Sequence, residues 1–243
     1  MKKAIIGNIK KTIRKTLYPN TCSSEAYIAY LRKRHAKIGD NILFTNPEEK
    51  PVDDTCVELL EMGEGCFVSS KVTILLHDYS FALIRKTHNC LIPKIVKTKI
   101  GNNVFLGRGC MVLMGAEIGD NCIIGAGSVV AGKYAPGSIV VGNPGRVIGT
   151  IDEYAKKLMS SLDKYAKDFY ETYSEIYKRP LSEWEMDCYM VLWKTDDYNH
   201  RKKIFKELPI RGDNIDEVVR DLMNYESIYE SYQDFLDSFS HKF

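Results

Sequence analysis

Residues 100–132 read IGNNVFLGRGCMVLMGAEIGDNCIIGAGSVVAG. An aliphatic side chain returns at every sixth position of this stretch, at Ile100, Leu106, Val112, Ile118, Ile124 and Val130. A spacing of six matches neither the 3.6-residue period of a helix nor the alternation of an ordinary strand. The stretch is therefore an internal repeat, and the repeat predicts the fold.

A second, mostly small position follows each aliphatic residue by four places, at Val104, Cys110, Ala116, Cys122, Ser128 and Tyr134. Glycine directly follows four of the aliphatic residues, at Gly101, Gly107, Gly119 and Gly125. A tight corner at these places would favour a residue without a Cβ atom. Six residues per face and three faces per coil predict a triangular parallel solenoid, with coils stacked about 4.8 Å apart so that their backbones pair.

The repeat extends, less regularly, on both sides of this stretch. It begins at Ile38 and is interrupted by a polar insert at 46–54, and its inward positions then continue at Met62, Cys66, Val68, Val72 and Ile74. The step from Ile74 to Ile100 is not a multiple of six, so residues 79–99 are predicted to leave the solenoid as an excursion. Long loops on a rigid scaffold often carry function. The run 140–148 closes the solenoid, which gives a β domain over 38–150.

The two flanks differ from the repeat in composition. Residues 1–40 hold ten Lys and Arg against two acids, and residues 1–37 are predicted to be a basic helical cap with Ser23 or Ser24 starting a helix through His35. This segment either contacts anionic lipid or a phosphorylated substrate, or only caps the open end of the solenoid. Residues 151–243 contain a single glycine and predict an α-helical extension.

Three helices are expected in that extension. The first covers 151–178, the second starts at a capping box of Ser182 and Glu185, and the third runs from Asn214 to about Phe239. The fold class is therefore mainly β, a parallel solenoid with an N-terminal helical segment and a C-terminal helical appendage.

Charge and cysteine usage exclude several classes. The formal net charge is +2, and no apolar run approaches the roughly 18–20 residues of a membrane span. The apolar stretch at the start is too short for a signal peptide, so we expect a cytoplasmic protein. We also expect no nucleic-acid partner. None of the seven cysteines forms a C-x-x-C pair, and Cys66, Cys110 and Cys122 fall on inward repeat positions. We expect these three to be reduced, buried fillers.

The repeats, a histidine before the excursion, the segments 100–107 and 124–130, and the closing Gly142-Asn143-Pro144-x-Arg146 resemble the left-handed β-helix acyltransferases, which carry hexapeptide repeats. Within that superfamily the chain is most similar to the O-acetyltransferases of bacterial capsule, O-antigen and exopolysaccharide synthesis, related to the maltose and galactoside acetyltransferases. The resemblance covers 38–150. It implies left-handed winding, acetyl-CoA as cosubstrate, no metal, and a homotrimer with active sites between subunits.

The resemblance also directs attention to His77, because similar enzymes keep a catalytic histidine where the excursion opens. Transfer to a hydroxyl needs a base that works near neutral pH, which imidazole provides. Asp78 could orient His77, but neighbours on a strand point to opposite sides, so a carboxylate from elsewhere or a backbone carbonyl could serve instead. His88 in the excursion is a rival base, and Arg85 and His88 are candidate contacts for the acceptor.

Carry-over by position gives the cosubstrate contacts. They are Phe105, where many relatives carry tryptophan, Gly107 and Arg108 beside the pantetheine arm, Ala126 near its middle, and Arg146 toward the nucleotide phosphates. One departure concerns the usual Thr-Lys pair after the last aliphatic residue, which is Ala131-Gly132 here. Lys133, one place later, is the remaining candidate for a phosphate contact, or an ordinary corner lysine.

The expected function is transfer of an acetyl group from acetyl-CoA to a sugar hydroxyl in surface-polysaccharide biosynthesis. His77 would act as general base in a direct attack without an acyl-enzyme. Three alternatives remain. An N-acyltransferase acting on an amino-sugar nucleotide is the nearest, and a non-catalytic hexapeptide scaffold is of another class. A γ-class carbonic anhydrase would need three histidines on zinc, and only His77 and His88 lie in the relevant part.

Overall fold

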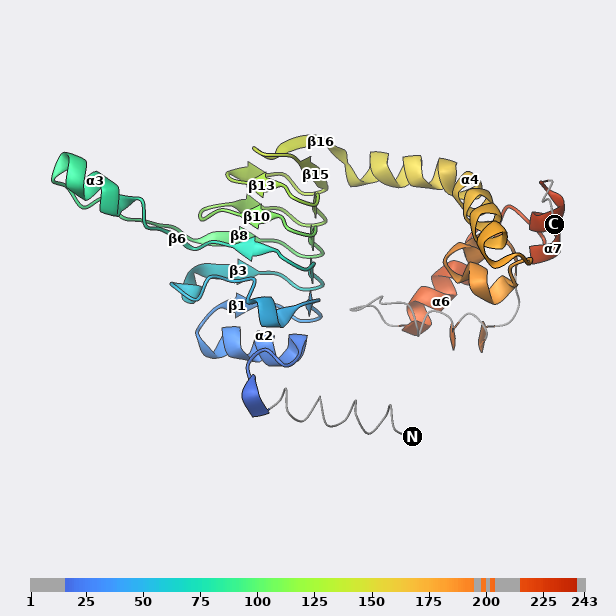
Figure 1. Cartoon of the computed structure of the whole chain (residues 1–243), viewed down its shortest axis with the longest axis horizontal. Helices are drawn as coiled ribbons and strands as arrows, with labels where there is room; N and C mark the ends of the chain where they lie inside the picture. The colour runs from blue at the N-terminus through green and yellow to red at the C-terminus, as the bar shows by residue number, and fades with distance from the viewer. Residues whose placement is uncertain (1–15, 195–197, 200–201, 204–214, 240–243) are drawn as a thin grey trace. The chain divides into compact units, whose positions relative to one another are not determined.

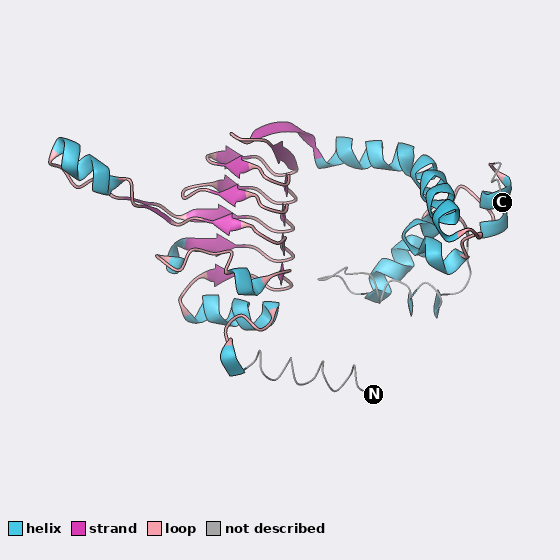
Figure 2. Ribbon diagram, viewed as in Figure 1, coloured by secondary structure: helices cyan, strands magenta, loops and turns pink. Residues whose placement is uncertain are grey.

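The computed structural model describes residues 16–194, 198–199, 202–203 and 215–239 (Figure 1). The chain divides into two compact units, Met1–Glu153 and Tyr154–Phe243. The first is built mainly of short strands and the second of helices (Figure 2). The lysine-rich start of the predicted basic cap, residues 1–15, lies outside the described residues, and so does the proposed lipid contact.

Three sheets form the faces of the first unit. Sheet A contains β1 (Lys37–Ile38), β3 (Leu60–Met62), β8 (Thr98–Ile100), β11 (Glu117–Ile118) and β14 (Lys133–Tyr134). Sheet B contains β2 (Leu43–Phe44), β4 (Phe67–Val68), β9 (Phe105–Leu106), β12 (Ile123–Ile124), β15 (Ser138–Val141) and β16 (Arg146–Thr150). Sheet C contains β5 (Thr73–Ile74), β10 (Met111–Val112) and β13 (Val129–Val130).

The chain passes through sheets A, B and C in turn and pairs in parallel with the preceding coil. Ile118 of β11 pairs with Ile100 of β8, eighteen positions earlier, and Ile124 pairs with Leu106 in the same way. Among the described strands of sheets A, B and C, the closing strand β16 alone runs antiparallel, against β15. This is the parallel stacking that three six-residue faces per coil predict (Figure 2).

The repeat positions point inward. All six aliphatic residues from Ile100 to Val130 are at most 3% exposed and belong to one core cluster. The second positions from Val104 to Ser128 are buried as well, whereas Tyr134 is half-buried. Burial raises the pKa of the Cys110 thiol to about 12. Gly107 shows why a corner needs glycine, since a Cβ atom there would lie 2.6 Å from the carbonyl oxygen of Ile124 in the next coil.

The outward positions of sheets A and B form two contrasting rows. Sheet A carries a charged ladder, in which consecutive residues are register partners: Lys37, Glu61, Lys99, Glu117 and Lys133. Sheet B carries an apolar ladder in the same arrangement: Leu43, Phe67, Phe105, Ile123 and Ile139. Cross-strand neighbours of opposite charge stabilise each other, so the charged ladder is satisfied within one chain.

The predicted insert at 46–54 contributes to the first coil. It contains the 3-10 helix η1 (Pro47–Glu49), and a second one, η2 (Val57–Leu59), follows it. Val52 forms a parallel bridge with Ile74, so the insert supplies a third face beside sheet C. The insert thus interrupts the six-residue spacing by two residues between Phe44 and Val52, but it keeps one bridge to the solenoid.

Helix α2 (Ser24–Lys33) packs on the first coil. Ser23 is its N-cap and accepts a hydrogen bond from the backbone N–H of Ala26 at 3.2 Å. Tyr27 and Leu31 are fully buried and join the solenoid core. The helix therefore covers apolar surface of the first coil.

The predicted excursion is an arm. Strands β6 (His77–Asp78) and β7 (Lys94–Ile95) pair antiparallel and carry helix α3 (Phe81–His88) at the far end (Figure 1). Many of its large apolar side chains are at least 41% exposed, namely Tyr79, Leu83, Leu91, Ile92, Ile95 and Val96. A single chain thus leaves much of the arm's apolar surface uncovered.

The second unit has a core of its own. Its elements are α4 (Ile151–Tyr177), the 3-10 helix η3 (Glu183–Leu192), α6 (Ile215–Met223) and α7 (Tyr232–Asp237). The capping box of Ser182 and Glu185 is present. The single helix predicted over 214–239 was wrong, because the chain leaves helical structure after Met223 and Ser231 caps the start of α7. Tyr170, Trp193 and Phe235 are fully buried at the centre of this unit.

Candidate functional site

His77 lies where the chain leaves sheet C for the arm. The preceding residues still belong to the solenoid, since the backbone N–H of Leu75 donates to the carbonyl of Val112 at 2.8 Å and Leu76 is fully buried. The His77 side chain is 16% exposed. The ring of Tyr79 packs edge to face against it, with centroids 4.4 Å apart. The imidazole is thus held in place but open to solvent on part of its surface.

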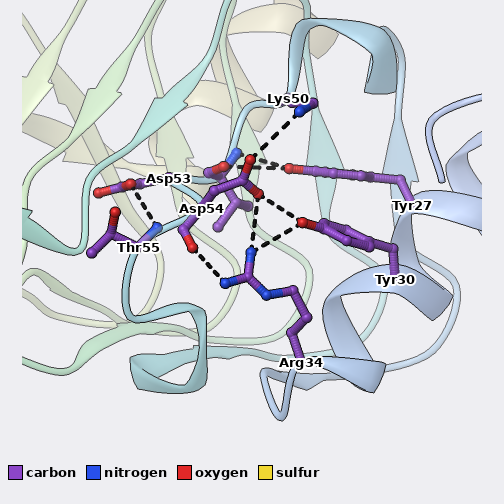
Figure 3. Close-up of polar contacts among 8 residues, drawn as sticks. Tyr27, Tyr30, Arg34, Lys50, Asp53, Asp54 and Thr55 are labelled. Carbon is purple, nitrogen blue, oxygen red and sulfur yellow. Dashed lines mark hydrogen bonds and ion pairs between the residues drawn. The ribbon is translucent and has the colours of Figure 1, made fainter. Parts of the chain in front are cut away.

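The carboxylate of Asp53 lies against Nδ1 of His77. Asp53 is itself only 12% exposed, and its Oδ1 accepts the backbone N–H of Thr55 at 2.9 Å (Figure 3). Its Oδ2 accepts the backbone N–H of Leu76 at 3.4 Å. A carboxylate at Nδ1 favours the proton on that nitrogen, which leaves Nε2 as the acceptor. The pair therefore has the arrangement of an oriented general base.

Asp78 does not occupy that position. Its carboxylate accepts the backbone N–H of Ser80 at 2.7 Å and the Ser80 hydroxyl at 3.0 Å. These hydrogen bonds, with a smaller contribution from Lys94, lower the pKa of Asp78. Asp78 thus stabilises the turn at the start of the arm, and the orienting contact expected of it is made by Asp53 instead.

Asp53 was missed because it sits in the polar insert. The pairing of Val52 with Ile74 would have indicated it, because this pairing places Asp53 beside the residues that lead into the arm. To predict this pairing from the sequence, one must treat two of the residues between Phe44 and Val52 as an insertion into the six-residue repeat. The six-residue period alone does not indicate where they belong.

The arm residues expected to contact the acceptor lie apart from His77 within one chain. Arg85 and His88 are on α3 at the far end of the arm, whereas His77 is at its base (Figure 1). Both are exposed, and Nδ1 of His88 lies 2.7 Å from the hydroxyl of Thr87. A single chain therefore does not bring His88 or Arg85 to the His77–Asp53 pair.

Most predicted cosubstrate residues gather at one corner, where the chain passes from sheet B to sheet C. Arg108 and Ala126 are exposed at the same place in successive coils, and the N–H of Gly127 donates to the carbonyl of Arg108 at 2.9 Å. Gly107 lies beside them. Phe105 is 40% exposed and stacks on Phe67 with centroids 5.3 Å apart.

Arg146 and Lys133 differ in their surroundings. Arg146 opens β16 directly after the turn that follows β15, and in the described part of the chain its guanidinium donates to the carbonyl of Gly145 alone, at 3.3 Å. Lys133 lies on sheet A and forms an ion pair with Glu117 at 3.0 Å. Arg146 is thus exposed for a ligand near the sheet B to sheet C corner, whereas Lys133 is engaged in the charged ladder.

The base and the cosubstrate corner lie at opposite edges of sheet C. The chain enters sheet C from the corner of Arg108 and Ala126, and it leaves sheet C toward sheet A at the level of His77. Within the described residues, no group of three or more His, Cys, Asp or Glu side chains is placed to hold a metal ion. In the same part of the chain, no helix has the length and apolar character to cross a membrane.

Comparison with known proteins identifies the repeat. Residues 97–132 match the family model described as bacterial transferase hexapeptide (six repeats). This segment is a bacterial transferase hexapeptide repeat. It covers β8 to β13, the most regular coils of the solenoid.

Several acetyltransferases share this hexapeptide repeat. "Putative acetyltransferase YvoF" of Bacillus subtilis is 29% identical over 137 residues, which are 56% of this chain and 72% of that protein. Galactoside O-acetyltransferase of Escherichia coli is 32% identical over 132 residues, which are 54% of this chain and 60% of that protein. The crystal structure of a maltose O-acetyltransferase from Clostridium difficile has 32% identity and a TM-score of 0.39, over 46% of this chain and 57% of that one.

These matches confirm the predicted resemblance to the hexapeptide-repeat acyltransferases. The chain spans less than two thirds of the length of the galactoside and maltose enzymes. The matched lengths are close to half of this chain, and the hexapeptide repeat itself lies wholly in the first unit.

Proposed function

We propose that this protein is an acetyl-CoA-dependent O-acetyltransferase that acts on a sugar hydroxyl in surface-polysaccharide biosynthesis. The observation that carries the proposal is the His77–Asp53 pair at the edge of a bacterial transferase hexapeptide repeat. The acetyltransferase relatives support acyl transfer as the reaction class, and the galactoside and maltose enzymes among them favour a sugar acceptor.

Each residue of the pair has a defined part in the reaction. Acetyl-CoA supplies the acetyl group as a thioester. Nε2 of His77 accepts the proton of the acceptor hydroxyl while the new C–O bond forms and the C–S bond breaks. The Asp53 carboxylate stabilises the imidazolium that results, and the imidazolium then returns the proton to the leaving sulfur. No side chain is acylated in this scheme.

The sheet B to sheet C corner has the chemistry that acetyl-CoA requires. Phe105 offers an exposed apolar ring to the pantetheine arm, and the backbone at Gly107 leaves no room for a Cβ atom. Arg108 and Arg146 present guanidinium groups that suit phosphate. Ala126 would lie between them, and Lys133 would have to leave Glu117 to take part.

The proposal includes a homotrimer with left-handed coils, in which each site forms between neighbouring subunits. Two observations support assembly. The base and the cosubstrate corner of one chain lie at opposite edges of sheet C, and both Phe105 of the apolar ladder and the arm expose large apolar side chains. A second copy that covers the arm would bring Arg85 and His88 toward a neighbouring site. The site of action we propose is the cytoplasm.

The test is the release of thiol from acetyl-CoA across a panel of sugars, sugar nucleotides and amino sugars. We expect release that depends on a hydroxyl acceptor and is lost in His77→Ala, with His88→Ala as the matched control on the arm. Release that requires an amine would make the protein an N-acyltransferase. Failure to bind CoA would overturn the proposal in favour of a scaffold.

A further inference from the structure

The segment that carries Asp53 is bound from two sides. On the solenoid side, the N–H of Asp53 donates to the carbonyl of Ile74 at 2.9 Å, and the N–H of Ile74 donates to the carbonyl of Pro51 at 2.7 Å. On the other side, the hydroxyl of Tyr27 accepts the N–H of Val52 at 3.2 Å and donates to the carbonyl of the same residue at 3.5 Å. Helix α2 therefore fixes the residue before Asp53.

Tyr27 suits this role because it stays neutral. Its side chain is fully buried, and burial raises its pKa well above the usual range. A neutral phenol can donate and accept at once, whereas a phenolate can only accept. The single hydroxyl of Tyr27 can therefore bind both the N–H and the C=O of Val52.

The residue after Asp53 is held even more extensively (Figure 3). Arg34 donates to the backbone carbonyl of Asp54 at 2.7 Å and to its carboxylate at 3.3 Å. The hydroxyl of Tyr30 donates to the same carboxylate at 3.0 Å and accepts from Arg34 at 3.0 Å. Lys50 adds an ion pair with Asp54 at 3.5 Å. A planar guanidinium that binds both a carbonyl and a carboxylate constrains orientation as well as distance.

We propose that Tyr30, Arg34 and Asp54 are positioning residues, which hold Asp53 against His77 and thereby fix the ring tautomer of the base. The proposal rests on the proposed function of His77. The residues on both sides of Asp53 are bonded to side chains of α2 and its C-cap, so loss of the Arg34 contacts weakens the hold on one end of the segment. Displacements of about 1 Å are enough to weaken an oriented catalytic pair. Helix α2 would then be part of the catalytic apparatus as well as a cap.

Arg32 provides a matched control on the same helix. Its guanidinium donates to the carbonyls of Ile38 and Gly39 at 2.9 and 2.7 Å, and to Asp40 at 2.7 Å. These bonds fasten α2 to the first strand without touching the residues around Asp53. Arg32 and Arg34 therefore separate attachment of the helix from positioning of the carboxylate.

The experiment compares full-length Arg34→Met, Arg32→Met and the parent protein by three measurements. Nitrogen-15 spectra of labelled histidine report which ring nitrogen of His77 carries the proton, steady-state kinetics give kcat and KM, and thermal melts give Tm. For Arg34→Met we expect a change from one Nδ1–H tautomer to a mixture of tautomers. We also expect kcat to fall on the order of 10-fold with KM unchanged. For Arg32→Met we expect a loss of Tm with the parent's tautomer and kcat.

Two results would overturn the proposal. One is the parent's tautomer and kcat in Arg34→Met, and the other is the same change in both arginine variants, which would trace the effect to helix attachment. If Arg34→Met does not fold, Tyr30→Phe removes one hydroxyl from the same network and should shift the tautomer in the same direction. The spectra need no substrate, so they decide the positioning role even if acetyl transfer is not found.

Discussion

The regular coils and the first coil of the same solenoid are built differently. In the regular coils Ile100 pairs with Ile118, eighteen positions later, and backbone pairing with buried aliphatic residues holds each turn. In the first coil Ile38 pairs with Met62, twenty-four positions later, and the extra residues are held by side chains of α2. The regular coils therefore supply stability, whereas the irregular first coil supplies the carboxylate of the proposed site.

The largest expected effect in this comparison concerns His77. Replacing His77 with alanine should lower the rate of acetyl transfer on the order of 10²–10⁴-fold, because no other group at that position can take the proton. The melting temperature should stay close to that of the parent, since the ring lies at the base of the arm and outside the core. Thiol release and circular dichroism melts measure the two quantities.

His88→Ala is the control for that prediction, because His88 is exposed on α3. It should keep most of the parent's kcat, because the loss of an acceptor contact would raise KM without removing the base. If His77→Ala retained activity and His88→Ala lost it, the base would belong to the arm, and the catalytic part of the comparison would be wrong.

The second effect tests the first coil itself. Asp53→Asn should lower kcat on the order of 10–100-fold, because the amide keeps the shape of the side chain but loses the charge that orients and stabilises the imidazolium. Asp78→Asn is the matched control, since among the described residues that carboxylate accepts hydrogen bonds from Ser80 in its own turn. It should leave kcat unchanged. Equal losses in both variants would contradict the assignment of Asp53.

The regular coils could be predicted from the sequence because one local rule repeats in them. Six-residue spacing placed Cys110 and Cys122 inside, and both are fully buried. In the first coil, side-chain contacts hold residues that do not follow the six-residue spacing, so the spacing does not predict which residues pair between coils. Asp53 was therefore missed, although it lies only one residue beyond Val52, which pairs in the solenoid.

Asp78 was one of several candidates to orient His77, beside a carboxylate from elsewhere or a backbone carbonyl. A carboxylate next to a turn readily accepts the nearest free N–H, here that of Ser80. In the second unit, the sequence over 214–239 was predicted to form one helix, but α6 ends at Met223 and α7 begins after its N-cap Ser231.

The third effect tests the packing of the regular coils. Cys122→Phe should destabilise the protein by about 1–3 kcal/mol, because the thiol fills a fully buried position and a ring would overpack it. Cys90→Phe, at an exposed position on the arm, should leave Tm unchanged. Thermal or denaturant unfolding of both variants measures the difference. An unchanged stability in Cys122→Phe would mean that the inward register is misassigned.

The smallest effect concerns the charged ladder, which joins the first coil to the regular ones. Glu61 of β3 forms ion pairs with Lys37 of β1, at 2.8 Å, and with Lys97, and these lysines lower its pKa from 4.5 to about 2. A carboxylate with a lowered pKa stabilises the folded state above its ordinary pKa and loses that contribution as the pH falls toward the lowered value. Glu61→Gln should therefore reduce Tm slightly at pH 7, and the difference from the parent should shrink between about pH 4.5 and pH 2. Added salt should shrink it as well, because the pairs are partly exposed. A Tm difference as large as that of Cys122→Phe, or one that grew on acidification, would show that the ladder rather than the core holds the first coil to the stack.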